Sequence, residues 1–238
     1  MGRKDDAGEG RSLSAELVAT RWDVEYRGGR YAAERPLPFV TEIVSTLRAH
    51  PAALAGVGLY VGCGNGRNYL PLIDAGLTLH GLDVSREALD QLAARRTTMT
   101  PRLTCADFRE LEIEAPFDYL VAIQVFQHGV QADTEAYFAK TAAALKVGGL
   151  FFLRVNSSAT QIFFRHTVVD QNEFGGLTVR YDEGPKNGLC VHFYSREELL
   201  ELARDRFRLL TEPREDVTAR LPPKTGNWSQ WEVVWQRQ

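Results

Sequence analysis

The apolar residues of this 238-residue chain gather in short runs that alternate with longer amphipathic segments. The runs lie at residues 59–61, 77–82, 102–105, 117–126 and 150–155. The fourth run is apolar at nearly every position, which is typical of a strand buried on both faces. Because right-handed crossovers join such strands, we expect five parallel strands whose carboxyl ends meet at one edge of a sheet.

The C-terminal part of the chain shows a different periodicity. Between residues 228 and 238, Trp231, Val233 and Trp235 share one face and Glu232, Val234 and Gln236 share the other, which predicts a strand. A further strand is expected to begin at residue 207. Before it, Ser195 followed three residues later by Glu198 predicts a capping box that opens a helix.

A glycine-rich turn follows the first apolar run. Gly62, Gly64 and Gly66 give the pattern G-x-G-x-G, which lets the backbone bend sharply and lets a ligand approach it closely. Dinucleotide-binding loops have G-x-G-x-x-G instead, and here Arg67 stands where their third glycine would be. This spacing disfavours a nicotinamide-dependent oxidoreductase, which we keep as a more distant alternative.

The tighter loop resembles the first motif of class I S-adenosylmethionine-dependent methyltransferases, and the motifs that follow are similar in order up to residue 155. The resemblance implies that Asp83, at the tip of the second strand, accepts hydrogen bonds from the ribose hydroxyls. The alternative is that Asp83 caps the helix expected at 85–95, although Ser85 could also do so.

The same resemblance assigns further cofactor contacts. Asp107 and Phe108 would recognise the adenine, unless Asp107 is an ordinary turn residue. Gln124, at the end of the fourth strand, would face the cofactor, and Gly148 and Gly149 are expected to end the helix at 134–145. The complete expected cofactor set is Tyr26, Gly62, Cys63, Gly64, Asn65, Gly66, Asn68, Asp83, Val84, Asp107, Phe108 and Gln124.

The family implies an α/β fold: a doubly wound, mostly parallel, Rossmann-like seven-stranded sheet with an antiparallel C-terminal strand. Residues 1–11 are expected to form a disordered tail, and 12–50 a helical lid similar to that of tellurite-resistance and thiopurine methyltransferases. The alternative is that Trp22, Tyr26 and Tyr31 simply pack that segment on the core. Residues 51–238 would form the methyltransferase domain.

An insertion is expected at about 156–193 within this domain. Alternation at 177–181 and 190–193 around a glycine-rich turn predicts a β-hairpin. Because the insertion follows the fifth strand, it would lie near the strand ends and could cover the acceptor. An edge hairpin or a contact between subunits is the alternative.

Composition narrows the possible partners. A net charge of −3 and an isoelectric point near 6.0 give no basic surface for nucleic acid. Cys63, Cys105 and Cys190 lack metal-ligand spacing, so we expect no metal and read them as thiols of a cytoplasmic protein. No apolar run is long enough to span a bilayer.

The resemblance implies transfer of a methyl group from S-adenosylmethionine to an O, N or S atom of a small-molecule acceptor. A phenol or alcohol acceptor needs a general base, for which His128, His166 and His192 are the candidates. The candidate acceptor contacts are Tyr31, Arg35, Arg154, Tyr194 and Trp228.

One position departs from the family pattern. Tyr60 occupies the place, two residues before the loop, that is usually acidic and helps to order the methionine end of the cofactor. A phenol could still hydrogen-bond there. The departure motivates an alternative function, a cofactor-binding or regulatory member of the same fold that has no turnover. The sequence favours no particular acceptor and no oligomeric state.

Overall fold

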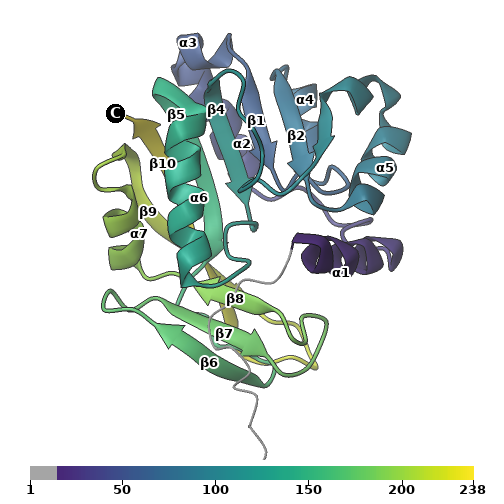
Figure 1. Ribbon diagram of the computed structural model, residues 1–238, viewed down its shortest axis with the longest axis vertical. Coiled ribbons are helices and arrows are strands. Elements are labelled where there is room, and N and C mark those ends of the chain that lie inside the picture. Colours follow the sequence, from purple (N-terminus) through teal and green to yellow (C-terminus); the bar gives the residue numbers. More distant parts are fainter. Residues whose placement is uncertain (1–14) are drawn as a thin grey trace, which may run out of the picture.

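The computed structural model describes residues 15–238, and the tail expected at residues 1–11 lies outside the described residues. A seven-stranded sheet forms the centre of the molecule, in the order β3-β2-β1-β4-β5-β10-β9 (Figure 1). Its strands are β1 (Gly58–Val61), β2 (Leu79–Asp83), β3 (Leu103–Cys105), β4 (Phe117–Ile123), β5 (Leu145–Asn156), β9 (Phe207–Ala219) and β10 (Asn227–Arg237).

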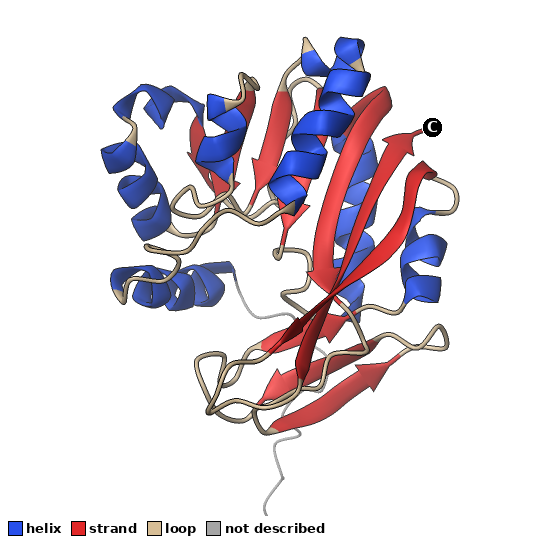
Figure 2. Cartoon of the chain, turned by 180° about the vertical axis from the view of Figure 1, so that it is seen from behind, coloured by secondary structure: helices blue, strands red, loops and turns tan. Residues whose placement is uncertain are grey.

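Strand directions confirm the predicted fold class. Strands β1 to β5 pair in parallel, whereas β10 is antiparallel to both β5 and β9. Helices cover both faces of the sheet, as seen from behind in Figure 2. The helices of the described residues are α1 (Ala15–Arg27), α2 (Phe39–Ala49), α3 (Pro51–Leu54), α4 (Tyr69–Asp74), α5 (Arg86–Arg95), α6 (Gln131–Ala144) and α7 (Arg196–Ala203), with a 3-10 turn η1 (Thr97–Arg102). Of these, α1 lies beyond the strand ends rather than on a face of the sheet.

Strand β4 contributes side chains to the hydrophobic cores on both faces of the sheet. Leu120 and Ala122 pack on one face of the sheet with residues of α6 and α7. Tyr119, Val121 and Ile123 pack on the other face with residues of α2, α4 and α5. All five side chains are buried, so the continuous apolar pattern reflects burial on both sides.

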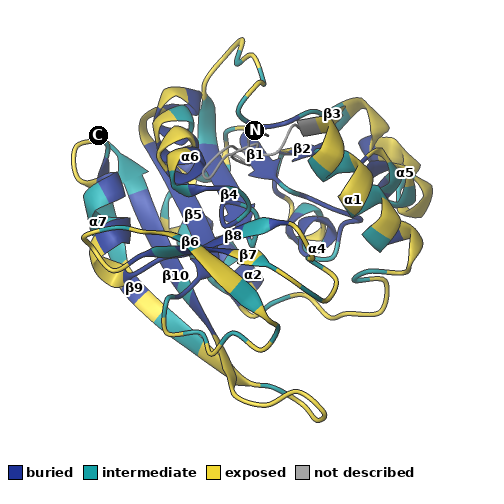
Figure 3. Cartoon of the chain, turned by 60° about the horizontal axis from the view of Figure 1, so that its bottom comes forward, coloured by how far each residue is buried: buried dark blue, intermediate teal, exposed yellow. Residues whose placement is uncertain are grey.

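The insertion forms a separate three-stranded antiparallel sheet. Strands β7 (Leu177–Tyr181) and β8 (Cys190–Phe193) make the predicted hairpin, and β6 (His166–Gln171) adds an outer strand that the sequence did not suggest. The residues of β6 are themselves exposed or half-buried, as Figure 3 shows. Both ribbon views place this sheet and α1 at the same end of the large sheet, beyond the carboxyl ends of its parallel strands.

Two local predictions were wrong in part. Strand β5 begins at Leu145, so Gly148 and Gly149 lie within an irregular start of this strand rather than in a helix terminus. At α7, Ser195 Oγ accepts a hydrogen bond from Glu198 N at 2.9 Å, but the Glu198 carboxylate contacts His192 instead of completing the capping box.

Among the described residues, no helix has the length and apolar character needed to cross a membrane.

Candidate functional site

A deep cleft opens at the carboxyl ends of β1, β2 and β4, beneath α1. It encloses about 1260 Å³ of empty space, its open mouth included. The cleft lies outside the carboxyl ends of the parallel strands, which is where open α/β sheets bind their ligands.

The glycine loop forms one wall of the cleft, and its shape depends on glycine. Gly62 has a φ of 71° and Gly64 a φ of 54°, both in the left-handed region. A Cβ atom on Gly64 would lie 2.4 Å from the Tyr26 hydroxyl, and one on Gly62 would lie 2.8 Å from Val125. A side chain at either position would close the space between the loop and its neighbours.

Asp83 lies at the end of β2, and only 7% of its surface is exposed. Its Oδ2 accepts a hydrogen bond from Gly64 N at 2.7 Å, and its Oδ1 accepts one from Ser85 N at 2.9 Å. Burial raises the pKa of this carboxyl to about 6, although the backbone amides oppose that shift. Helix α5 is capped instead by Ser85, whose Oγ accepts from Ala88 N at 3.1 Å. The Asp83 carboxylate therefore holds the loop while it lines the cleft.

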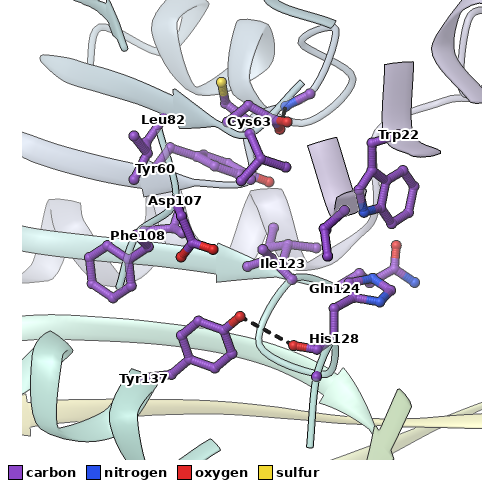
Figure 4. Close-up of a pocket in the computed structure, with 18 of the residues that line it drawn as sticks. Trp22, Tyr60, Cys63, Leu82, Asp107, Phe108, Ile123, Gln124, His128 and Tyr137 are labelled. Carbon is purple, nitrogen blue, oxygen red and sulfur yellow. Dashed lines mark hydrogen bonds between the residues drawn. The ribbon is translucent and has the colours of Figure 1, made fainter. Parts of the chain in front are cut away.

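Asp107 is fixed by an arginine two residues later. Arg109 donates to both of its carboxylate oxygens, at 3.0 and 2.6 Å, and also pairs with Asp133 at the start of α6. These hydrogen bonds from Arg109 lower the pKa of Asp107 although its burial works the other way. Asp107 thus stays ionised, and Phe108 beside it is buried at the same wall (Figure 4).

Two asparagines connect the loop to its surroundings. Asn68 Oδ1 accepts a hydrogen bond from Leu37 N at 2.9 Å. The Asn65 amide nitrogen donates to the carbonyl of Arg30 at 3.0 Å. Its buried Oδ1 has no hydrogen-bond partner within residues 15–238, so a polar acceptor in the cleft wall is left unsatisfied.

Tyr60, the departure from the family pattern, is also in the cleft wall. Its ring is almost completely buried and packs edge-on against Tyr69 at 6.0 Å. Burial raises the pKa of the Tyr60 phenol well above its usual value, and a hydrogen bond with Asn68 works against that rise. The phenol is therefore neutral at physiological pH and supplies a dipole where the family usually has a charge.

Helix α1 covers the cleft and is attached to α5. Asp23 Oδ1 accepts from Ser85 Oγ at 2.6 Å and from Glu87 N at 3.1 Å, so it satisfies a free amide at the start of α5. The Gln91 side chain donates to the carbonyl of Tyr26 at 3.0 Å. These contacts hold Trp22 and Tyr26 over the glycine loop.

His128 lies where the cleft meets α1 (Figure 4). Its ring meets that of Trp22 edge to face, with 5.1 Å between the centroids. Burial, followed by the charges of Lys186 and Arg30, lowers the pKa of His128 well below its ordinary value, against a hydrogen bond to the Gln124 backbone. The imidazole is consequently neutral at pH 7.

The other two candidate histidines are not in the cleft. His192 is fully buried between the insertion sheet and α7, where one ring nitrogen contacts Thr178 at 2.8 Å and the other contacts Glu198 at 2.9 Å. His166 lies on the outer strand β6, and its Nδ1 contacts the carbonyl of Phe164 at 2.9 Å. With both nitrogens of His192 engaged and His166 remote, the structure gives neither a role as a base.

Four of the five candidate acceptor contacts also lie outside the cleft, and only Tyr31 lines it. The buried Arg154 pairs with Glu232, which is also buried, and with Asp216, which is partly exposed. The Tyr194 hydroxyl donates to the carbonyl of Phe126 at 2.5 Å. Trp228 donates to Asn156 at 3.0 Å, and Arg35 is exposed. Arg154, Tyr194 and Trp228 are thus each engaged outside the cleft. The carbonyl of Arg35 accepts a hydrogen bond from Arg67 at 2.8 Å.

Every expected cofactor residue lines the cleft except Gly66, which packs under Leu70 and Leu92. The sequence interpretation did not include several further lining residues: Val18, Arg67, Arg109, Val130, Tyr137, Leu189 and Cys190. A short acidic-basic pattern, Asp107 followed by Arg109, could have suggested one of them. Among the described residues, no group of three or more potential metal ligands occurs.

Comparisons with known proteins agree with this arrangement. Residues 59–149 match the family model described as a methyltransferase domain. The cypemycin N-terminal methyltransferase of a Streptomyces species is 29% identical over 113 residues, which are 47% of this chain and 46% of that protein. The match thus spans about half the length of that relative.

Solved structures resemble the whole chain. The 1,6-didemethyltoxoflavin-N1-methyltransferase of Burkholderia thailandensis superposes with a TM-score of 0.62 at 19% identity, covering 99% of this chain and 98% of that one. The magnesium protoporphyrin IX methyltransferase of Synechocystis PCC 6803 gives a TM-score of 0.63 at 14% identity, with 95% and 98% covered. At these identities the likeness shows the fold. Residues 59–149, from β1 to the start of β5, are therefore similar to a methyltransferase domain, and the chain shares its fold with these solved structures.

Proposed function

We propose that this protein binds S-adenosylmethionine and transfers its methyl group to an O, N or S atom of a small-molecule acceptor. One observation carries the proposal: the Asp83 carboxylate lies in the wall of a large cleft and is bound to the glycine loop. The structures of the Burkholderia enzyme with S-adenosylhomocysteine and of the Synechocystis enzyme with S-adenosylmethionine support the choice of cofactor.

The residues of the cleft fit this cofactor. A carboxylate that already accepts two backbone amides still has lone pairs for two ribose hydroxyls. Asp107 and Phe108 lie at the end of β3, where an adenine would be in reach, and the unsatisfied Asn65 Oδ1 is an acceptor that a ligand donor could complete. We therefore assign Asp83 to the ribose and Asp107 with Phe108 to the adenine.

The bound cofactor supplies an electrophilic methyl carbon on a sulfonium, and the chain supplies position and a dry environment. Trp22 and Tyr26 cover the cleft and exclude water. Holding an acceptor at about 3 Å from the methyl carbon supplies most of the rate enhancement. For an acceptor whose nucleophile must lose a proton, we assign that proton to the neutral imidazole of His128.

The partners and location follow from the same proposal. The acceptor is a small molecule rather than a nucleic acid, which the net charge of −3 supports. A cytoplasmic location is supported by Cys63, Cys105 and Cys190, all of which are free thiols. Tyr60 favours a second function, cofactor binding without turnover, because a neutral phenol replaces the usual carboxylate in the cleft wall.

Transfer of a radiolabelled methyl group separates these two functions. The purified chain is incubated with methyl-labelled S-adenosylmethionine and a broad panel of phenols, amines, thiols and carboxylic acids. Our proposal predicts labelled product from at least one acceptor class, with an equal amount of S-adenosylhomocysteine released. Tight cofactor binding without label transfer to any member of the panel would instead favour the non-catalytic function.

A further inference from the structure

A second, smaller cavity adjoins the cleft beside α1. The two share Trp22 and Leu189, and the smaller one adds Arg21, Glu25, Arg30 and Lys186 to its lining. Its empty space is about 270 Å³ when its open mouth is included. Its walls come from α1, the residues that follow α1, and the loop between β7 and β8 of the insertion. The insertion and the lid therefore build it together.

The charges in this cavity do not balance. Three cationic side chains face one carboxylate, that of Glu25. Arg30 donates to Glu25 at 3.1 Å, and Arg21 donates to the carbonyl of Asn187 at 2.7 Å. Lys186 is half-buried, and its ammonium has no hydrogen bond or ion pair with any residue between 15 and 238. Within these walls, one positive charge is left without a direct partner.

Arg30 also has unused donor capacity. Its guanidinium lies over the ring of Tyr31, 4.8 Å from the centroid. Its Nε is buried and lacks a hydrogen-bond partner within the described part of the chain. Unsatisfied buried donors are uncommon in folded proteins and call for an explanation such as a missing ligand. The Lys186 ammonium and the Arg30 guanidinium group thus line the same small space.

We propose that the acceptor is an aromatic carboxylate, whose charged group lies between Lys186 and Arg30 while its ring extends past Trp22 toward His128. This inference rests on the proposed function, because it assigns the substrate class of the same site. Carboxylates match both donors, since guanidinium and ammonium groups make short, charge-assisted hydrogen bonds to them. The aromatic walls of Trp22, Tyr31 and His128 favour a flat ring beside the charge.

The ionisation of the site supports the same ligand. Burial, together with the positive charge of Arg30, lowers the pKa of Lys186 to about 8, while Glu25 works in the opposite direction. His128 faces the same group and is neutral, so Arg30, Glu25 and His128 define the charges around the ammonium. Lys186 is mostly protonated at pH 7, and a bound carboxylate would stabilise that form. Affinity for the acid should therefore fall as the pH rises through about 8.

Matched pairs of ligands test this proposal. The full chain, saturated with S-adenosylhomocysteine, is titrated with a set of substituted benzoates and with the corresponding benzamides, and binding is followed by ligand-observed NMR at pH 7. Lys186→Gln and Arg30→Gln are compared with Lys146→Gln. Lys146 lies at the opposite end of the sheet, in an exposed pair with Asp118, and is the matched control.

We expect at least one acid to bind tenfold or more tightly than its amide, and Lys186→Gln to remove most of that difference. A tenfold change corresponds to about 1.4 kcal/mol. Lys146→Gln should retain the preference. Equal binding of acids and amides throughout the set, no binding of any acid, or a preference that survives both substitutions would overturn the inference. Saturation with S-adenosylhomocysteine is verified first, so a failure of the cofactor proposal is seen separately.

Discussion

Replacing Asp83 with asparagine removes the charge that we assign to the ribose while it keeps the size of the side chain. In the native protein, the carboxylate accepts from Gly64 N at 2.7 Å and from Ser85 N at 2.9 Å. An asparagine oxygen can retain one of these bonds, but its amide group then points a donor at the other backbone N–H. The substitution therefore affects both the loop and the ligand.

The expected loss follows from these contacts. Hydrogen bonds to charged groups contribute about 1.5–3 kcal/mol each, so losing one to a ribose hydroxyl should weaken S-adenosylhomocysteine binding at least tenfold. The pH dependence of the ligand affinity gives an independent test. With a pKa of about 6, Asp83 is roughly one-tenth ionised at pH 5 and nine-tenths ionised at pH 7. Native affinity should consequently rise about tenfold between these pH values, because the ionised form accepts the hydroxyls.

The free energy of unfolding of the ligand-free protein should fall as the pH rises, whereas the ligand affinity should rise. The pKa of Asp83 in the folded state lies above its ordinary value, so the folded protein binds more protons than the unfolded one between about pH 4 and 6. This carboxyl thus contributes stability at low pH that is lost as the pH rises through about 6. A bound ligand that donates hydrogen bonds to the carboxylate should reverse that loss.

Calorimetric titrations of the native protein and of Asp83→Asn from pH 5 to pH 7 measure both effects. Asp74→Asn is the matched control, because Asp74 is exposed at the end of α4, where it pairs with Arg96. The reasoning is refuted if Asp83→Asn, shown to be folded by its melting transition, binds as tightly as the native protein. It is equally refuted if the affinity rise with pH persists in that variant.

Three further predictions concern residues outside the ribose contact. His192→Ala should lower the free energy of unfolding by about 3 kcal/mol in urea titrations, because the buried Glu198 carboxylate loses the imidazole and keeps only the side-chain amides of Asn172 and Gln131 as donors among residues 15–238. A loss below 1 kcal/mol would contradict this. Asp23→Ala should lower the free energy of unfolding by about 1 kcal/mol, because it removes the cap that attaches α1 to α5. It should also speed amide hydrogen exchange in α1, and unchanged exchange would argue against the attachment. His128→Ala should reduce the turnover of a hydroxyl acceptor by about 10²-fold or more without weakening cofactor binding, and undiminished turnover would exclude its role as base.

The sequence predicted the parts of the site that depend on local order along the chain. Strand β1, the glycine loop and Asp83 follow one another within one βαβ unit, so spacing alone places them at one edge of the sheet. The apolar run of β4 similarly predicted a strand buried on both faces. Hairpin β7–β8 was predictable because both of its strands alternate around a glycine-rich turn.

Contacts between distant elements could not be predicted in this way. The sequence made Arg154 a candidate acceptor contact. In the structure, β10 is antiparallel to β5 and places Glu232 opposite Arg154, which pairs with it. His192 was likewise a candidate base from the sequence, but in the structure Glu198 of α7 contacts its ring. The cavity around Lys186 depends on the insertion meeting α1, and no local pattern indicates that meeting. In each case the partner comes from another part of the chain, so the role of the residue depends on tertiary structure.

Calorimetric titration of the full chain with S-adenosylmethionine tests the central claim most directly. The account predicts one-to-one binding with a dissociation constant on the order of micromolar or tighter, about −8 kcal/mol, and no binding of NADH to a loop with G-x-G-x-G spacing. Absence of binding by both S-adenosylmethionine and S-adenosylhomocysteine would contradict it, because the cleft, the loop and Asp83 would then lack the ligand that we assign to them.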